Sequence, residues 1–104
     1  MSTRLRKSKR NAVAVDPGTK TANLRRLRRI EGQVRGLQKM VAEDRYCADI
    51  LMQVSSVQQA LRGVAIELMR NHLKHCATHA IQKGSRAQSA AMYDEIVSLM
   101  RKHF

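Results

Sequence analysis

The sequence predicts an all-α protein, a three-helix protomer that associates with copies of itself. Apolar residues recur at helical spacing over most of the 104 residues, and only 5 Gly and 1 Pro interrupt them. Aromatic residues make up 3% of the chain, which argues against a sheet protein. A chain this short buries a thin core, so we expect self-association.

Residues 1–20 form the first element, a basic tail that we expect to be flexible. It ends on the turn signal Asp16-Pro17-Gly18, and a helical domain over residues 21–104 follows. The tail lacks the apolar stretch of a secretory signal, and no run of 18 apolar residues occurs anywhere. We therefore expect a cytoplasmic protein with no membrane partner.

The first helix is expected to begin near Ala22, capped by Thr21 or Asn23. An apolar stripe follows it, made of Leu27, Ile30, Val34, Leu37 and Val41. The opposite side is basic and carries Arg25, Arg28, Arg29, Arg35 and Lys39. Gly32 and Gly36 are stacked one turn apart, a spacing that can mark close approach of another helix.

The second helix is expected to run from about Arg45 to about Ala80, with Asp44 able to cap it. Its apolar residues step by four and three in a coiled-coil seam: Ile50, Val54, Val57, Leu61, Val64 and Leu68. Gly84 and Ser85 break the pattern, and residues 87–102 predict a third, shorter amphipathic helix.

The residues that can carry chemistry are Cys47, His72 and Cys76. His72 and Cys76 stand four residues apart on one helix, where two side chains can share a metal ion. Cys47 precedes His72 by 25 residues, about 37 Å along a continuous helix at 1.5 Å per residue, so one chain cannot bring all three together.

Two copies in antiparallel arrangement can do so. The midpoints of the pairs 47/72 and 47/76 both fall beside Leu61, near the centre of the seam. A two-fold dimer then forms two identical sites, each with Cys47 of one chain and His72 and Cys76 of the other. Taken singly, a cysteine on an apolar seam is more often a small core residue, and a histidine near a helix end is usually solvated.

Two thiolates and one imidazole form a soft, three-coordinate set that favours Cu(I), one ion per protomer. Zn²⁺ usually requires a fourth ligand, for which His79 is better placed than His75, and counting ligands leaves Ni²⁺, Co²⁺ and Zn²⁺ open. Catalysis is not expected, because Ser55-Ser56 has no neighbouring base and no paired carboxylates or phosphate loops occur.

The charge predicts a nucleic-acid partner. The formal charge is +12, and 12 of the 20 Lys and Arg lie within residues 1–39, where only Asp16 and Glu31 oppose them. We expect contacts with the phosphates of double-stranded DNA, dominated by charge and DNA shape. The candidate DNA-binding residues are Arg25, Arg26, Arg28, Arg29, Arg35, Lys39, Arg62 and Arg70.

Residues 22–102 resemble the copper-sensing operon repressor family, also called the CsoR/RcnR family of metal-responsive repressors. The resemblance is carried by the block RIEGQVRG, the step Tyr46-Cys47, the region Gln53-Val54-Ser55 and the pair His72-x₃-Cys76. It implies a three-helix protomer, an antiparallel dimer and a disc-like tetramer. It also implies a cytoplasmic repressor, not an enzyme, that binds operator DNA without metal and leaves it when metal binds.

The copper-responsive members of that family use a Cys-His-Cys set, which corresponds here to Cys47, His72 and Cys76. Tyr46 and Glu95 match positions proposed to couple the metal site to DNA. The resemblance thus implies Cu(I)-dependent derepression of copper-resistance genes by residues 21–104. The alternatives are a sensor of Ni, Co, Zn or a thiol persulfide, and a basic helical protein that coats nucleic acid without sensing.

Overall fold

The computed structural model describes residues 10–104, and the expected tail lies outside this range over residues 1–9. The described residues form helices and connections, with no strand among them. The all-α prediction is therefore confirmed. Within the described part of the chain, no helix combines the length and the apolar character needed to cross a membrane.

The chain divides into two compact units. Residues 16–70 form the α2–α3 unit, which contains α2 (Pro17–Ala42) and all of α3 (Cys47–Asn71) except its last residue. Residues 10–15 and 71–104 are described in the second unit, named here the C-terminal unit. It contains η1 (His72–Ala77), α4 (Thr78–Lys83) and α5 (Arg86–His103).

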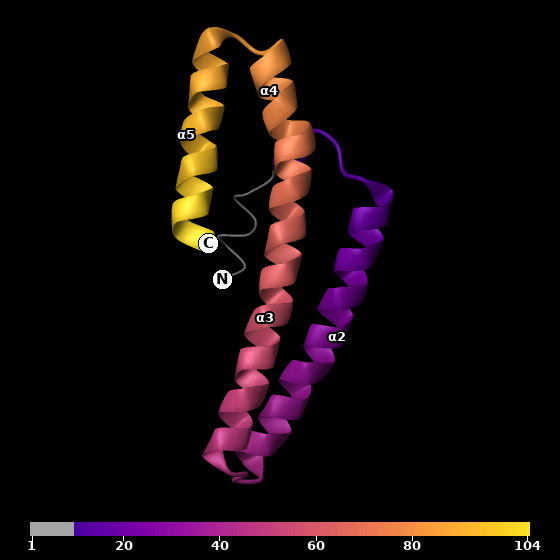
Figure 1. The fold of residues 1–104 in the computed structure, drawn as a ribbon. Helices are drawn as coiled ribbons and strands as arrows, with labels where there is room; N and C mark the ends of the chain where they lie inside the picture. The colour runs from indigo at the N-terminus through magenta and orange to yellow at the C-terminus, as the bar shows by residue number, and fades with distance from the viewer. Residues whose placement is uncertain (1–9) are drawn as a thin grey trace. The chain divides into compact units, whose positions relative to one another are not determined.

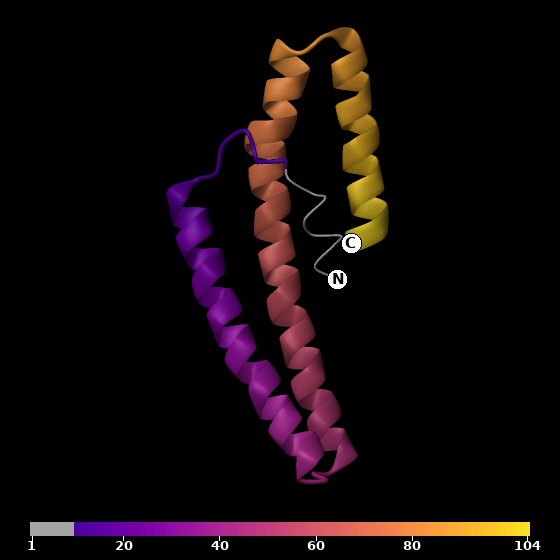
Figure 2. The same cartoon turned by 180° about the vertical axis from the view of Figure 1, so that it is seen from behind.

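In the α2–α3 unit, α2 and α3 run side by side in opposite directions, as Figures 1 and 2 show from two sides. Ile30 of α2 packs against Val57 and Val64 of α3, and each of these side chains is less than 10% exposed. Leu37 and Ala60 extend this cluster. Burying side chains of this size contributes about 1.5–3 kcal/mol each, so this small cluster holds the pair of helices together.

The cluster uses only half of the predicted α3 seam. Val57 and Val64 point at α2, whereas Leu61 and Leu68, the alternate seam positions, are 45% and 58% exposed. Leu27, Val34 and Val41 of the α2 stripe are also exposed. The seam and the stripe are therefore larger than the contact that α2 and α3 make with each other.

The first helix starts earlier than the sequence predicts. α2 begins at Pro17, with Asp16 as its N-cap, so the expected start near Ala22 is wrong. Proline suits the first helical position because its φ is already helical and the missing N–H has no partner there anyway. Asn23 lies inside α2 as a buried side chain, and its Oδ1 accepts a hydrogen bond from Arg26 at 3.3 Å.

The turn from α2 to α3 also differs from the prediction. Asp44 does not cap the second helix: it adopts a positive φ of 54° just after α2, and its N–H donates to the carbonyl of Val41 at 3.2 Å. Aspartate tolerates this left-handed conformation better than most residues. α3 then begins at Cys47, where the Asp49 and Ile50 N–H groups bond the Tyr46 carbonyl.

The second helix is interrupted where the sequence predicts continuity. Residues 72–77 form a π-helix, η1, between α3 and α4. The Thr78 hydroxyl donates to the carbonyl of Leu73, five residues earlier, at 2.9 Å. Ala77 at the end of η1 is the most buried apolar residue described, 2% exposed. Single π-turns of this kind are rare and occur frequently at functional sites.

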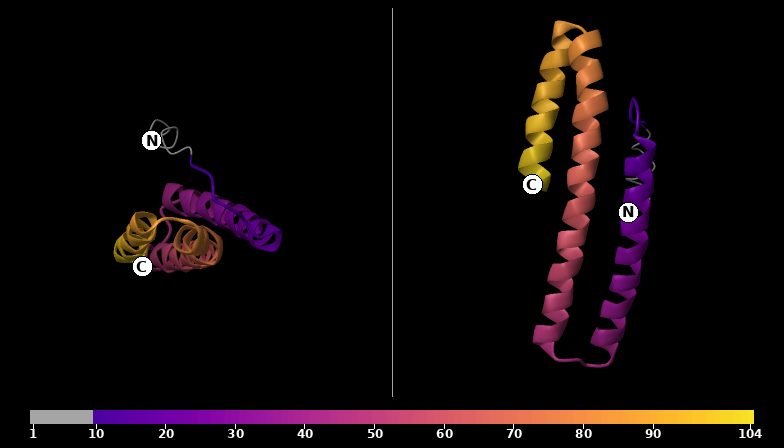
Figure 3. Two further views of the ribbon diagram at one scale, coloured as in Figure 1. Left: turned by 90° about the horizontal axis from the view of Figure 1, so that it is seen from above. Right: turned by 45° about the vertical axis from the view of Figure 1, so that its right-hand side comes forward.

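α4 and α5 form an antiparallel hairpin (Figure 3), and the break between them falls at Gly84 and Ser85, as predicted. Ser85 caps α5 in a capping box: its Oγ accepts from the Gln88 N–H at 3.2 Å, and the Gln88 side chain accepts from the Ser85 N–H at 2.7 Å. The Ser89 hydroxyl lies 3.3–3.4 Å from the carbonyls of Ala80 and Ile81. These bonds fix the position of α5 beside α4.

Candidate metal centre

His72 and Cys76 both lie on η1, and both are half-buried. They line one cavity of about 490 Å³ in the C-terminal unit. Its other walls come from residues 10–13, from His79 and Ala80 of α4, and from Met92 and Glu95 of α5. The structure therefore places the predicted imidazole and thiol on a common cavity.

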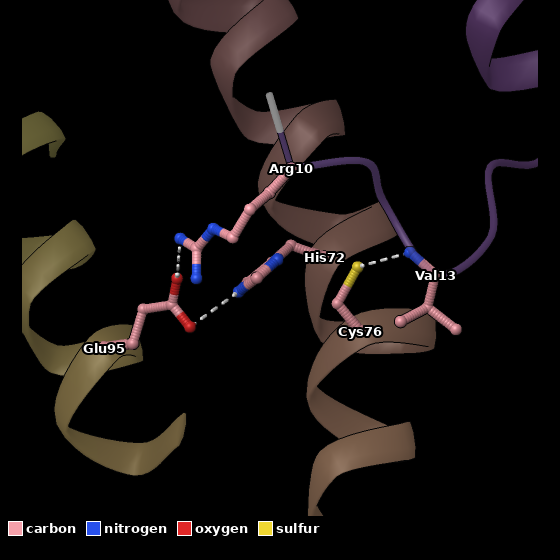
Figure 4. Close-up of polar contacts among 5 residues, drawn as sticks. All are labelled: Arg10, Val13, His72, Cys76 and Glu95. Atoms are coloured by element: carbon pink, nitrogen blue, oxygen red, sulfur yellow. Dashed lines mark hydrogen bonds and ion pairs between the residues drawn. The ribbon is translucent and has the colours of Figure 1, made fainter. Parts of the chain in front are cut away.

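The imidazole of His72 has an unsatisfied nitrogen. Its Nε2 atom is buried and finds no hydrogen-bond partner among residues 10–104. The Glu95 carboxylate lies close by, with Oε2 3.9 Å from Nε2 (Figure 4). Buried polar atoms are usually hydrogen-bonded, and neutral imidazole and thiolate are both ligands for soft metal ions. These donors fit a metal ion of that kind.

The N-terminal segment contacts the thiol of Cys76 and the carboxylate of Glu95. The backbone N–H of Val13 donates to Cys76 Sγ at 3.4 Å, and Arg10 reaches Glu95 at 3.7 Å (Figure 4). Ala14, the residue after Val13, accepts a hydrogen bond from the Asn71 side chain through its carbonyl at 3.0 Å. Because Glu95 contacts both Arg10 and His72, its carboxylate lies between these two side chains. We name residues 10–15 the N-terminal strap.

Sequence reasoning missed this strap, because it assigned residues 1–20 to the tail. The contacts Val13–Cys76 and Ala14–Asn71 join residues about 60 positions apart. The only available signal was compositional: the stretch Asn11-Ala12-Val13-Ala14-Val15 is uncharged within an otherwise basic segment.

Cys47, the third predicted ligand, belongs to the other unit. It is the first residue of α3 and is exposed, and Tyr46 beside it is 73% exposed. Both cysteines are free thiols. Among residues 10–104, no three or more His, Cys, Asp or Glu side chains are grouped so that they could hold a metal ion. The described chain therefore brings together the pair His72 and Cys76, with Glu95 beside His72.

The two other candidate ligands differ in position. His79 lines the same cavity as Cys76 and is exposed. His75 is half-buried and lies outside the lining of that cavity. His79 also lines a neighbouring cavity of about 710 Å³, next to Lys83 and Gln88.

The candidate DNA-binding side chains are all exposed. Arg35 pairs with Glu31 at 3.9 Å, and Arg70 pairs with Glu67 at 3.7 Å, so acidic neighbours offset part of their charge. Exposed pairs of this kind contribute about 0–1 kcal/mol and can exchange for other anions. Six of the residues lie on α2 and two on α3: Arg25, Arg26, Arg28, Arg29, Arg35 and Lys39, then Arg62 and Arg70.

Comparison with known proteins supplies the context for this geometry. Residues 19–102 match the family model described as metal-sensitive transcriptional repressor. The copper-sensing transcriptional repressor CsoR of Bacillus subtilis is 48% identical over 77 residues, which are 74% of this chain and 73% of that protein. The copper-sensing transcriptional repressor RicR of Mycobacterium tuberculosis is 44% identical over 77 residues, or 74% of this chain and 80% of that protein.

A solved structure agrees in fold. The Cu(I) form of the copper-sensing repressor CsoR from Geobacillus thermodenitrificans superposes with a TM-score of 0.73 at 42% identity, over 86% of this chain and 94% of that one. The family match covers most of the chain, including η1, α3 and nearly all of α2, the two helices that carry the candidate DNA-binding residues. The chain belongs to the metal-sensitive transcriptional repressor family.

Proposed function

We propose that this chain is a Cu(I)-responsive transcriptional repressor. Without metal it binds double-stranded operator DNA in the cytoplasm, and with Cu(I) bound it leaves the DNA and derepresses copper-resistance genes. The family and the copper-sensing relatives support this function. The family works by binding and not by catalysis, and no enzymatic step is part of the proposal.

One observation carries the choice of a soft metal. A buried imidazole nitrogen without a hydrogen-bond partner among residues 10–104 and a thiol line the same cavity. Hard cations such as Mg²⁺ and Ca²⁺ prefer oxygen ligands, whereas thiolate and imidazole suit Cu(I). Cys76 and His72 are thus two of the three ligands in this proposal.

Cys47 of the partner subunit is the third ligand. An antiparallel dimer centred near Leu61 places Cys47 of each protomer at the end of α3 that meets the other protomer's η1. The exposed half of the α3 seam, Leu61 and Leu68, supports such an interface. The dimer then holds two sites, one Cu(I) per protomer, and two dimers form the tetramer.

The residues around the site act on its ligands. Glu95 Oε2 lies 3.9 Å from His72 Nε2, so its negative charge favours a cation beside that ring, and Tyr46 adjoins Cys47 at the start of α3. Bound Cu(I) supplies a link between thiolates of two protomers. Because Cys47 starts the helix that follows α2, holding Cys47 against the partner's η1 changes how the basic α2 surfaces face DNA.

The deciding experiment is a Cu(I) titration of the protein–DNA complex. The probe is a labelled duplex that has been selected because the metal-free protein binds it. We expect one equivalent of Cu(I) per protomer to lower the affinity of the protein for this duplex at least about 5-fold, which is the lower end of the range for allosteric coupling. Cys47→Ala should bind the duplex normally and stay bound when Cu(I) is added. His72→Ala should behave like Cys47→Ala, and His103→Ala, which changes a histidine at the exposed C-terminal end, is its matched control.

Each other outcome has a definite meaning. Release of Cys47→Ala by Cu(I) contradicts the ligand set. Release by Ni²⁺, Co²⁺, Zn²⁺ or a persulfide donor, without any response to Cu(I), contradicts the choice of copper. Absence of release by all of them contradicts sensing and supports a protein that coats nucleic acid.

A further inference from the structure

Asn71 is a buried polar side chain that lies next to the candidate ligands. It is the last residue of α3, directly before His72, and it is 8% exposed. Burying an amide without hydrogen bonds is costly, so its partners define what the residue does. One of its N–H groups donates to the Ala14 carbonyl at 3.0 Å, across 57 residues of sequence.

This bond fixes the strap where it crosses η1. Ala14 and Val13 are consecutive, so holding the Ala14 carbonyl also places the Val13 N–H, which donates to Cys76 Sγ at 3.4 Å. The ion pair of the strap is weaker. Arg10 and Glu95 are 3.7 Å apart, and the Arg10 side chain is 92% exposed, so this pair adds little.

We propose that Asn71 is a positioning residue of the metal centre, which acts on Cys76 through the strap. By holding Ala14, it keeps the Val13 N–H against the Cys76 sulfur and keeps residues 10–13 in the wall of the cavity that Cys76 lines. In the metal-free protein the strap limits access of reagents to the thiol. The consequence for metal affinity rests on the proposed function, whereas the consequence for thiol access does not.

The first test measures how fast Cys76 reacts with iodoacetamide in the metal-free, full-length Cys47→Ser protein, where it is the sole thiol. Asn71→Asp keeps the shape of the side chain but removes the N–H donors, and the negative charge that it adds repels a thiolate, so the charge by itself cannot raise the alkylation rate. We expect the alkylation rate to rise about 3- to 10-fold, the effect of losing one hydrogen bond. Asn71→Gln retains an amide donor and should stay closer to the parent rate than Asn71→Asp.

Val13→Pro tests the same path from the other end, because proline has no N–H to donate to Cys76. It should raise the rate by a similar factor, and Val13→Ala, which keeps the N–H, should not. If Asn71 acts through the strap, Asn71→Asp adds little further increase in the Val13→Pro background. If the alkylation rate of the double variant rises by the product of the two single-variant factors, the two residues act independently, and the proposal is overturned.

Asn23→Asp is the matched control for loss of a buried amide. Asn23 is 6% exposed and lies in the α2–α3 unit, whereas the strap belongs to the C-terminal unit, so Asn23→Asp shows what loss of a buried amide does on its own. An equal rise in alkylation for Asn23→Asp, or an unchanged rate for Asn71→Asp, would contradict the proposal. Should Asn71→Asp fail to fold by circular dichroism, Asn71→Ser replaces it and is judged by the same two outcomes.

The second test measures Cu(I) affinity by competition with a chelator, in protein that retains both cysteines. Asn71→Asp should weaken binding about 3- to 10-fold, and Asn23→Asp should not. If the parent protein binds no Cu(I), the proposed function fails while the alkylation test still decides the role of Asn71. If the parent binds Cu(I) and Asn71→Asp changes neither readout, the proposed function stands and the role of Asn71 is refuted.

Discussion

Gly36 and Gly84 illustrate opposite uses of the same residue type. A Cβ added at Gly36, in the middle of α2, meets no atom of residues 10–104 within 4 Å, the helix's own backbone aside. A Cβ added at Gly84, between α4 and α5, would lie 2.5 Å from the Ala80 carbonyl oxygen and 2.7 Å from Gln88 Oε1. Of these two glycines, only Gly84 is required by its surroundings within the described chain.

We therefore predict that Gly36→Ala raises the free energy of unfolding by about 1 kcal/mol, because alanine loses less backbone entropy in a helix. Gly84→Ala should lower it, since the turn must shift to admit the methyl group. Urea unfolding followed by circular dichroism measures both. Destabilisation by Gly36→Ala would indicate that a second copy approaches α2 at this glycine.

The residues of the candidate site differ in how well the sequence reveals them. His72 and Cys76 were predicted as a pair because their spacing is local and has a direct meaning on a helix. The strap contacts of Val13 and Ala14 have no local pattern, because a backbone N–H and a carbonyl are present at almost every residue. Only the fold selects which of them meet η1.

At the scale of elements, we predict that the exposed cations of α2 contact DNA. Arg25, Arg28 and Arg29 are exposed on this helix. Replacing all three with Ala should weaken binding and reduce the slope of log K against log salt by about one unit for each phosphate that the variant no longer neutralises. Fluorescence anisotropy over a NaCl series measures the slope.

The matched control removes the same charge from α5, through Ala at Arg86, Arg101 and Lys102. This triple variant should bind with nearly the slope of the parent protein. An unchanged slope for the α2 variant would place the DNA surface on another element.

The helices themselves were mostly predictable, and their ends were less so. The period of apolar residues gave three helical segments and the break at Gly84-Ser85, because burial follows that period. The start of α2 was missed because Asp16-Pro17-Gly18 suits a turn as well as a first helical turn. η1 was missed because its apolar spacing does not differ from that of an α-helix over six residues.

At the scale of the whole molecule, the unused half of the α3 seam bears on assembly. We predict that Leu61→Glu shifts the protein towards monomers, because it places a charge at the centre of the proposed interface. Sedimentation velocity over a range of concentrations measures the shift. Leu51→Glu, on the same helix but off the seam and 65% exposed, is the matched control.

Assembly that survives Leu61→Glu unchanged would contradict an interface centred on this residue. Packing inside the protomer does not depend on the oligomeric state, because Val57 and Val64 pack against α2 whether or not Leu61 contacts a second protomer. The only indication of this interface in the sequence is that the positions midway between Cys47 and His72, and between Cys47 and Cys76, both fall near the centre of the α3 seam.

The π-helix between α3 and α4 has a consequence for the length of the chain. The hydrogen bonds of a π-helix join residues five apart, so each of its turns holds more residues than a turn of an α-helix. Deleting one position between His72 and Cys76 would let that stretch relax to ordinary α geometry, with the ligands three apart in place of four. Homologous chains one residue shorter here would then retain the helix but present the imidazole and sulfur in a different relative orientation.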